Sequence, residues 1–136
     1  MGFDIFGPTR HMKASNTDDG SASPYDILNL PDVLGLKFPL LKKLNDRFYD
    51  STILRFASGD VESLRDELGE LLIAYRARRE RELIEEHHVH AIDPSVRSDI
   101  VARLLDQDVT FRALGEFLLL CEEAIAAKAD VRCEGD

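Results

Sequence analysis

Side chains able to bind a metal ion gather near position 90 of the chain. They are Glu85, Glu86, His87, His88, His90 and Asp93. Carboxylate oxygens and imidazole nitrogens are both common ligands of zinc and iron. On a continuous helix, residues three or four apart are neighbours, so Glu85 and His88 share one face and Glu86 shares another with His90. Because His88 and His90 point apart, the histidines converge only if the helix breaks near Val89.

The metal hypothesis takes Glu85, Glu86, His87, His88 and His90 as its site. The pair Glu85 and His88 has the Glu-x-x-His spacing of di-iron helical bundles, which need a second such pair. The only other histidine is His11, so the second pair is missing. A polar helix end is the simpler interpretation, because cationic histidine is favoured near the last carbonyls of a helix. A pH-sensing or partner-contact role is the third.

A run of alternating charges, RARRERE, precedes this cluster at positions 76–82. Arg76 and Glu80 are four residues apart, as are Arg78 and Glu82, which is the spacing of ion pairs along a helix. Such a run usually forms a solvated helix surface. The alternative is a contact surface in which arginines of this run, among them Arg76, Arg78 and Arg79, bind a phosphate or an acidic partner.

Acidic residues dominate the rest of the chain, whose formal net charge is −9. This charge argues against binding to nucleic acid or to an anionic membrane, since both require positive charge. It suits a partner protein with a basic surface, whose association the acids would accelerate. The acids expected to share such a face lie in two helical stretches: Glu62, Asp66, Glu67, Glu70, Glu116, Glu122 and Glu123.

The sequence contains no P-loop, no Gly-x-Ser-x-Gly, no His-Glu-x-x-His and no dinucleotide-binding motif. Its two cysteines, Cys121 and Cys133, are too few for a disulfide framework and indicate reduced thiols. No secretory signal and no apolar run of membrane-spanning length is present. These features predict a cytoplasmic protein, most simply a bacterial one.

Apolar residues recur at helical spacing in four stretches, which predicts an all-α fold. The first stretch opens at Pro39 and carries its apolar face through Phe56, and the second runs from Val61 to about His87. The third begins with Asp93 as cap, and the last is capped by Asp108 or Thr110. Short connections make successive helices antiparallel neighbours, so we expect an antiparallel helical bundle of about four main helices with a flexible N-terminal segment.

We divide the chain into three parts. Residues 1–22 form a flexible N-terminal segment or a tag-like extension, in which residues 2–6 are a short strand or an apolar plug. Residues 23–130 form the helical domain, and residues 131–136 form a frayed tail. Inside the helices, Gly69 and Gly115 suggest a close crossing where two backbones approach.

The sequence therefore predicts a non-enzymatic acidic binding protein of inhibitor or immunity type, without a cofactor. Its expected partner-binding residues are Glu67, Glu70, Arg76, Arg78, Arg79, Glu122 and Glu123. One alternative is a metal-dependent helical-bundle enzyme that uses the cluster at 85–90. The other is a self-associating helical adaptor, a homodimer in which the stripe around Leu83 and Ile84 pairs between chains.

Overall fold

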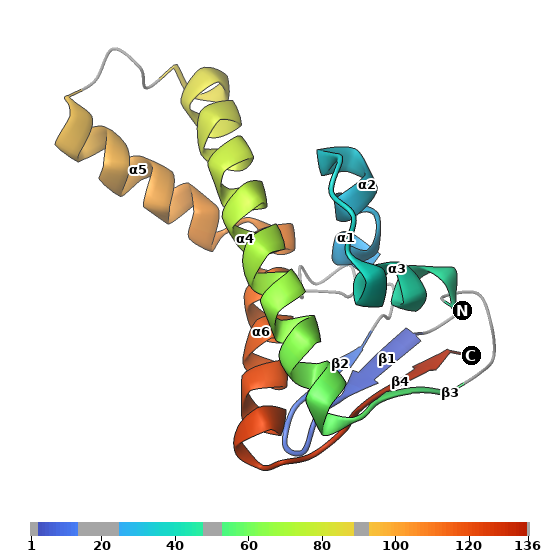
Figure 1. Ribbon diagram of the computed structural model, residues 1–136. Coiled ribbons are helices and arrows are strands. Elements are labelled where there is room, and N and C mark those ends of the chain that lie inside the picture. The colour runs from blue at the N-terminus through green and yellow to red at the C-terminus, as the bar shows by residue number, and fades with distance from the viewer. Residues whose placement is uncertain (1–2, 14–24, 48–52, 89–92, 136) are drawn as a thin grey trace.

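The computed structural model of the protein describes residues 3–13, 25–47, 53–88 and 93–135. The elements run in the order β1 (Phe3–Phe6), β2 (His11–Lys13), α1 (Tyr25–Leu28), α2 (Leu30–Leu34), α3 (Pro39–Asp46), β3 (Ile53–Phe56), α4 (Ser58–Glu86), α5 (Pro94–Asp106), α6 (Val109–Ala126) and β4 (Val131–Gly135). The fold is mixed α/β, with helices beside one antiparallel sheet (Figure 1). The prediction of an all-α helical bundle is therefore wrong.

The sheet has four strands in the order β2-β1-β4-β3. Its central pair joins the two ends of the chain, because Ile5 of β1 lies opposite Cys133 of β4. Three of the strands thus come from segments for which the sequence predicted no sheet. Strands β1 and β2 lie in the predicted N-terminal segment 1–22, and β4 lies in the predicted frayed tail 131–136. Of the two structures predicted for residues 2–6, the strand is confirmed over residues 3–6.

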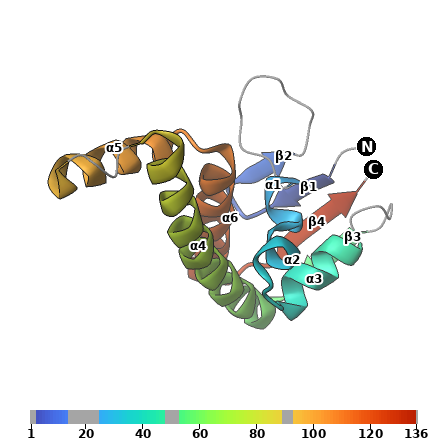
Figure 2. The same cartoon turned by 90° about the horizontal axis from the view of Figure 1, so that it is seen from above.

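Side chains alternate across the sheet as the period of two requires. One face is buried and contributes Ile5, Met12, Leu54, Phe56, Val131 and Cys133 to the main core. Helices α4 and α6 supply most of the residues that cover this face, with α1 and α3 completing the cluster (Figure 2). The core therefore lies between the sheet and the helices.

On the opposite face of the sheet, Phe6 stands in one row with its cross-strand neighbours His11 and Arg132. The rings of Phe6 and His11 stack with centroids 4.2 Å apart, and the Arg132 guanidinium carbon lies 4.7 Å from the Phe6 centroid. The hairpin of β1 and β2 is thus joined to β4 by side chains as well as by backbone pairing.

The helix predicted from Pro39 to Phe56 is only partly correct. Pro39 does begin α3, but α3 ends at Asp46, and Ile53–Phe56 is the edge strand β3. Residues 48–52 lie outside the described residues. Leu54 and Phe56 are buried while Ile53 is exposed, so this stretch follows the period of a strand.

Helix α4 confirms the long helix predicted from Val61 to about His87, since it spans Ser58–Glu86. Its first half packs against α6 in the main core through Leu64, Leu68 and Leu71. Its second half forms a separate cluster in which Leu83 packs with residues of α5. The end of α4 and the neighbouring α5 therefore form an arm that projects away from the sheet (Figure 1).

The predicted caps of the last two helices are confirmed. The Asp93 carboxylate accepts the Ser95 N–H at 3.0 Å at the start of α5. The Asp108 carboxylate accepts the Phe111 N–H at 2.8 Å at the start of α6. Each bond satisfies one backbone donor that has no partner within its helix.

The close helix crossing predicted at the two helical glycines is not present. Among the described residues, a Cβ atom built on Gly69 or on Gly115 would meet no heavy atom within 4 Å beyond its chain neighbours and the backbone of its own helix. Both glycines therefore face open space in α4 and α6.

Candidate functional site

Glu67, one of the expected partner-binding residues, joins two helices of the fold instead of facing solvent. Its carboxylate accepts the backbone N–H groups of Leu40, at 3.1 Å, and Leu41, at 3.0 Å. These donors belong to the first turn of α3, whose own N-cap residue Phe38 supplies no side-chain bond. Glu67 thus caps α3 from α4.

Glu123 is also occupied within the fold. Its carboxylate pairs with the Nε of Arg10 at 2.7 Å and accepts a longer bond of 3.4 Å from the Thr9 hydroxyl. Thr9 and Arg10 lie between β1 and β2, so Glu123 fastens this hairpin to α6.

Arg79 belongs to a polar cluster where α4 meets the start of α6. Its guanidinium contacts Glu82 at 2.9 Å, Asp108 at 3.0 Å and Glu86 at 3.1 Å. Tyr75 also donates its hydroxyl to Asp108, at 2.8 Å, so Asp108 holds both helices as well as capping α6. Burial, followed by the bond to Asp108, raises the pKa of Tyr75.

Arg76 and Arg78 form the ion pairs that their spacing predicts. Arg76 contacts Glu80 at 2.9 Å, and Arg78 contacts Glu82 at 3.0 Å. All four side chains are more than one-third exposed, so each pair contributes less than about 1 kcal/mol. These arginines are available at the surface, whereas Arg79 is largely enclosed by its three carboxylates.

Glu70 and Glu122 are exposed, and neither carboxylate has a hydrogen-bond or ion-pair partner among the described residues. Glu62, Asp66 and Glu70 are four residues apart and so share one side of α4. Glu62 also lines a shallow hollow of about 160 Å³ with Ile125, which is one turn from Glu122 on α6. We name Glu62, Asp66, Glu70 and Glu122 the acidic face.

The acidic face is only lightly compensated. Asp66 pairs with Arg65 at 3.2 Å, and Lys128 lies at the hollow beside Glu62. Residues 58–75 of α4 contain five acidic side chains and one basic side chain, whereas residues 76–86 contain four of each. The negative charge of α4 is therefore concentrated on the half that packs beside α6.

Helical phase distinguishes the acids of this face from Glu67. Glu67 is three residues after Leu64 and four before Leu71, both of which are fully buried. It therefore flanks the buried stripe, while Glu62, Asp66 and Glu70 lie on the far side of the helix. This spacing is the sequence signal that separates the internal carboxylate from the exposed ones.

The Glu/His cluster lies where α4 ends. Glu86 contacts Arg79, His87 is the residue that terminates the helix, and His88 has a left-handed φ of 52°. In the part of the chain that the structure describes, no group of three His, Cys, Asp or Glu residues is arranged to hold a metal ion. Because His90 lies outside the described residues, the metal site at 85–90 stays a prediction.

The stripe expected to pair between chains is covered within the chain. Leu83 is buried against Val101 and Leu105 of α5, and Ile84 packs against the same cluster. This stripe is therefore the inner surface of the arm.

The two thiols lie in the core. Cys121 and Cys133 are fully buried, and burial raises the pKa of Cys121 to about 12 and raises that of Cys133 further. Cys133 is an inward residue of β4, although the sequence predicted a frayed tail over residues 131–136.

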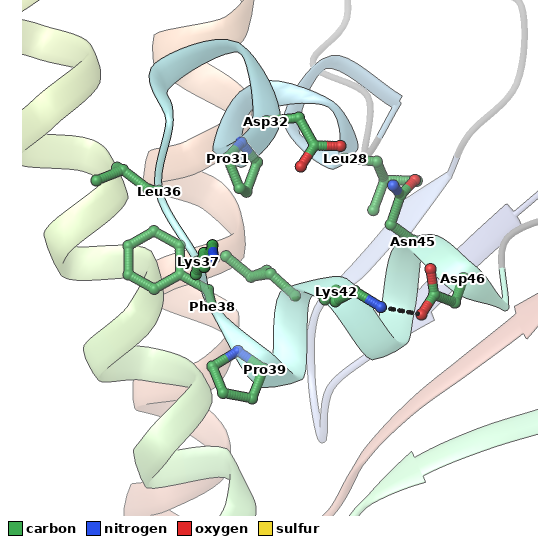
Figure 3. Close-up of a pocket in the computed structure, with 11 residues that line it drawn as sticks. Leu28, Pro31, Asp32, Leu36, Lys37, Phe38, Pro39, Lys42, Asn45 and Asp46 are labelled. Atoms are coloured by element: carbon green, nitrogen blue, oxygen red, sulfur yellow. Dashed lines mark hydrogen bonds and ion pairs between the residues drawn. The ribbon is translucent and has the colours of Figure 1, made fainter.

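A pocket of about 500 Å³, which no sequence pattern predicted, lies between α2, residues 35–38 and α3 (Figure 3). Its apolar wall includes the buried residues Leu28, Pro31, Phe38 and Leu41. Charged and amide side chains stand at its rim: Asp32, Lys37, Lys42, Asn45 and Asp46. The prolines on each side of a short loop are the only sequence signal for it.

Comparison of the chain with protein-family models, curated proteins and solved structures gives no match. Within the described residues, no helix combines the length and the apolar character needed to cross a membrane.

Proposed function

We propose that this protein is a non-enzymatic binding protein of inhibitor or immunity type, whose acidic face covers a basic surface of a partner protein. The observation that supports the proposal is the set of exposed, weakly compensated carboxylates on α4 and α6. Other carboxylates of the same helices, those of Glu67 and Glu123, are used inside the fold.

Like charges gathered on one side of a helix repel each other when the protein is free. A basic partner removes that repulsion and gains favourable long-range attraction, which raises its association rate. Helices α4 and α6 pack together in the main core and carry these carboxylates on their exposed sides. Because exposed charges are screened by salt, the complex should weaken as ionic strength rises.

Affinity capture with matched variants tests this proposal. The bait proteins are the wild type, an acidic-face variant and an arm variant, each offered to a lysate of the source cell at low and high salt. The acidic-face variant carries Glu62→Lys, Glu70→Lys and Glu122→Lys. The arm variant carries Glu85→Lys, Asp99→Lys and Asp106→Lys, which changes the net charge by the same amount at exposed positions remote from the face.

We expect the wild type and the arm variant to retain the same basic protein at low salt, and the acidic-face variant to lose it. Equal loss with both variants would show that net charge alone governs retention. Equal retention by all three would remove the acidic face from the interaction.

A further inference from the structure

We infer that the pocket between α2 and α3 binds a small zwitterion with an apolar body, namely a free apolar α-amino acid or a short apolar peptide with both termini charged. This site is separate from the acidic face, and the inference does not depend on the proposed function.

The size and lining of the pocket suit a small ligand. Ligand sites in proteins commonly have volumes of about 300–1,000 Å³, with mostly apolar walls and a few polar groups that fix orientation. This pocket has a volume of about 500 Å³, walls formed by residues such as Leu28, Pro31 and Phe38, and its charges at the rim. An apolar side chain of the ligand would therefore occupy the interior.

The backbone fixes one wall of the pocket. Gly35 has a left-handed φ of 70°, and its N–H bonds to the Asp32 carbonyl at 3.2 Å. The Leu36 N–H bonds to the Pro31 carbonyl at 2.8 Å, which completes the double-bonded end of α2. This turn brings Leu36, Lys37 and Phe38 back beside α2, so the pocket is formed before a ligand arrives.

The rim charges select for a zwitterion. Lys42 and Asp46 pair with each other at 3.2 Å on the α3 side of the opening (Figure 3). The side chains of Asp32 and Lys37 have no ion-pair or hydrogen-bond partner among the described residues. The rim thus offers one free anion and one free cation and has no net charge. A ligand ammonium would pair with Asp32 and a ligand carboxylate with Lys37, whereas a ligand with a single charge would satisfy only one of them.

Three compounds that share a phenyl ring and a two-carbon linker test this selection: phenylalanine, 2-phenylethylamine and 3-phenylpropanoate. Binding is measured by titration of the full chain, followed by backbone amide resonances. Leucyl-leucine, in a separate titration, distinguishes a peptide from a free amino acid as the natural class. Asp32→Asn and Lys37→Gln remove the free charges, and Asp60→Asn and Lys43→Gln are controls at exposed acidic and basic positions outside the pocket.

We expect phenylalanine or leucyl-leucine to bind more tightly than both singly charged analogues. Each rim variant should weaken that ligand by about two- to fivefold, the effect of one solvent-exposed ion pair, while the controls leave it unchanged. Three results would overturn the inference. They are tighter binding of a singly charged analogue, equal binding of all compounds, and the absence of any chemical-shift change in the amide resonances of residues 28–46.

Discussion

At the scale of single residues, the carboxylates of this protein divide into those that hold the fold and those that face solvent. Glu67 illustrates the first kind, because it reaches from α4 to cap α3. Glu70, one turn further along, illustrates the second. The two residues were predicted from sequence as members of one surface, yet their surroundings give them opposite roles.

Replacement of Glu67 by alanine should lower the free energy of unfolding by about 1–2 kcal/mol, since two partly buried N–H groups of α3 lose their acceptor. Glu70→Ala is the matched control on the same helix and should stay within about 0.5 kcal/mol of the wild type. Urea denaturation of both variants makes the comparison. Equal effects would show that the cap contributes nothing.

Glu82 links stability to pH. Its pKa is held below the ordinary value of 4.5, first by the hydrogen bond from Arg79 and then by that from Arg78. The folded protein therefore binds this proton less readily than the unfolded chain. The stabilisation is therefore fully present above pH 4.5, the pKa of the unfolded chain. It is lost as the pH falls through the lower pKa that Glu82 has in the folded protein.

Glu82→Gln should accordingly reduce stability at neutral pH and flatten its decline in the acid range below 4.5. Thermal unfolding as a function of pH provides the measurement. Glu85→Gln, three residues away and exposed, is the control and should keep the slope of the wild type. A wild-type slope in the Glu82 variant would assign the acid dependence to other carboxylates.

At the scale of elements, the glycines show how much stability a single side chain adds to a helix or removes from it. Gly69 lies inside α4 with open space where a side chain would stand. Gly69→Ala should raise the free energy of unfolding by about 0.5–1 kcal/mol, because glycine in a helix interior costs conformational entropy.

Gly35→Ala should do the opposite, since its left-handed backbone at the end of α2 disfavours a side chain. Chemical denaturation of the two variants compares them directly. A loss of stability in Gly69→Ala would mean that a neighbour approaches this glycine after all.

The long helices and their caps could be predicted from the sequence, whereas the sheet could not. Helix α4 carries its apolar stripe over many turns, and Asp93-Pro94 marks the start of α5 by local chemistry alone. The strands have three to five residues each, too few for a clear period of two. In the stretch Ile53–Phe56, apolar residues at the first and fourth positions also fit a helix.

Tertiary pairing decides the structure of these short segments. β1 becomes a strand because β4, from the far end of the chain, lies beside it, and no local pattern encodes that contact. For the same reason, the sequence identified the exposed acids of α4 but not the pocket, whose lining comes from α1, α2, α3 and residues 35–38.

At the scale of the whole molecule, strands β1 and β4 pair with each other and pack in the same core. The two buried thiols of that core become reactive only where it opens. Burial raises the pKa of Cys121 to about 12, so at pH 8 almost none of this thiol is in the reactive thiolate form. Cys133 lies in the central strand β4, where it is fully buried.

Neither thiol should react with a thiol-specific reagent in the native protein, and both should react once the chain unfolds. The measurement is the reaction rate with and without denaturant. Cys133→Ala separates the two thiols, leaving Cys121 as the single reporter. Rapid native labelling of Cys133 would show that β4 detaches from the sheet.

At this scale, negative charge is also unevenly distributed over the molecule. The weakly compensated carboxylates of the acidic face lie on α4 and α6 between the sheet and the projecting arm, whereas the acids and bases of the second half of α4 balance. The most direct test is the dissociation constant of the captured partner, measured by calorimetry with the wild type, the acidic-face variant and the arm variant. We predict that the acidic-face variant binds about tenfold or more weakly, since close charge pairs at interfaces contribute about 1.5 kcal/mol or more, and that the arm variant matches the wild type. Equal affinity of the wild type and the acidic-face variant would contradict the proposal.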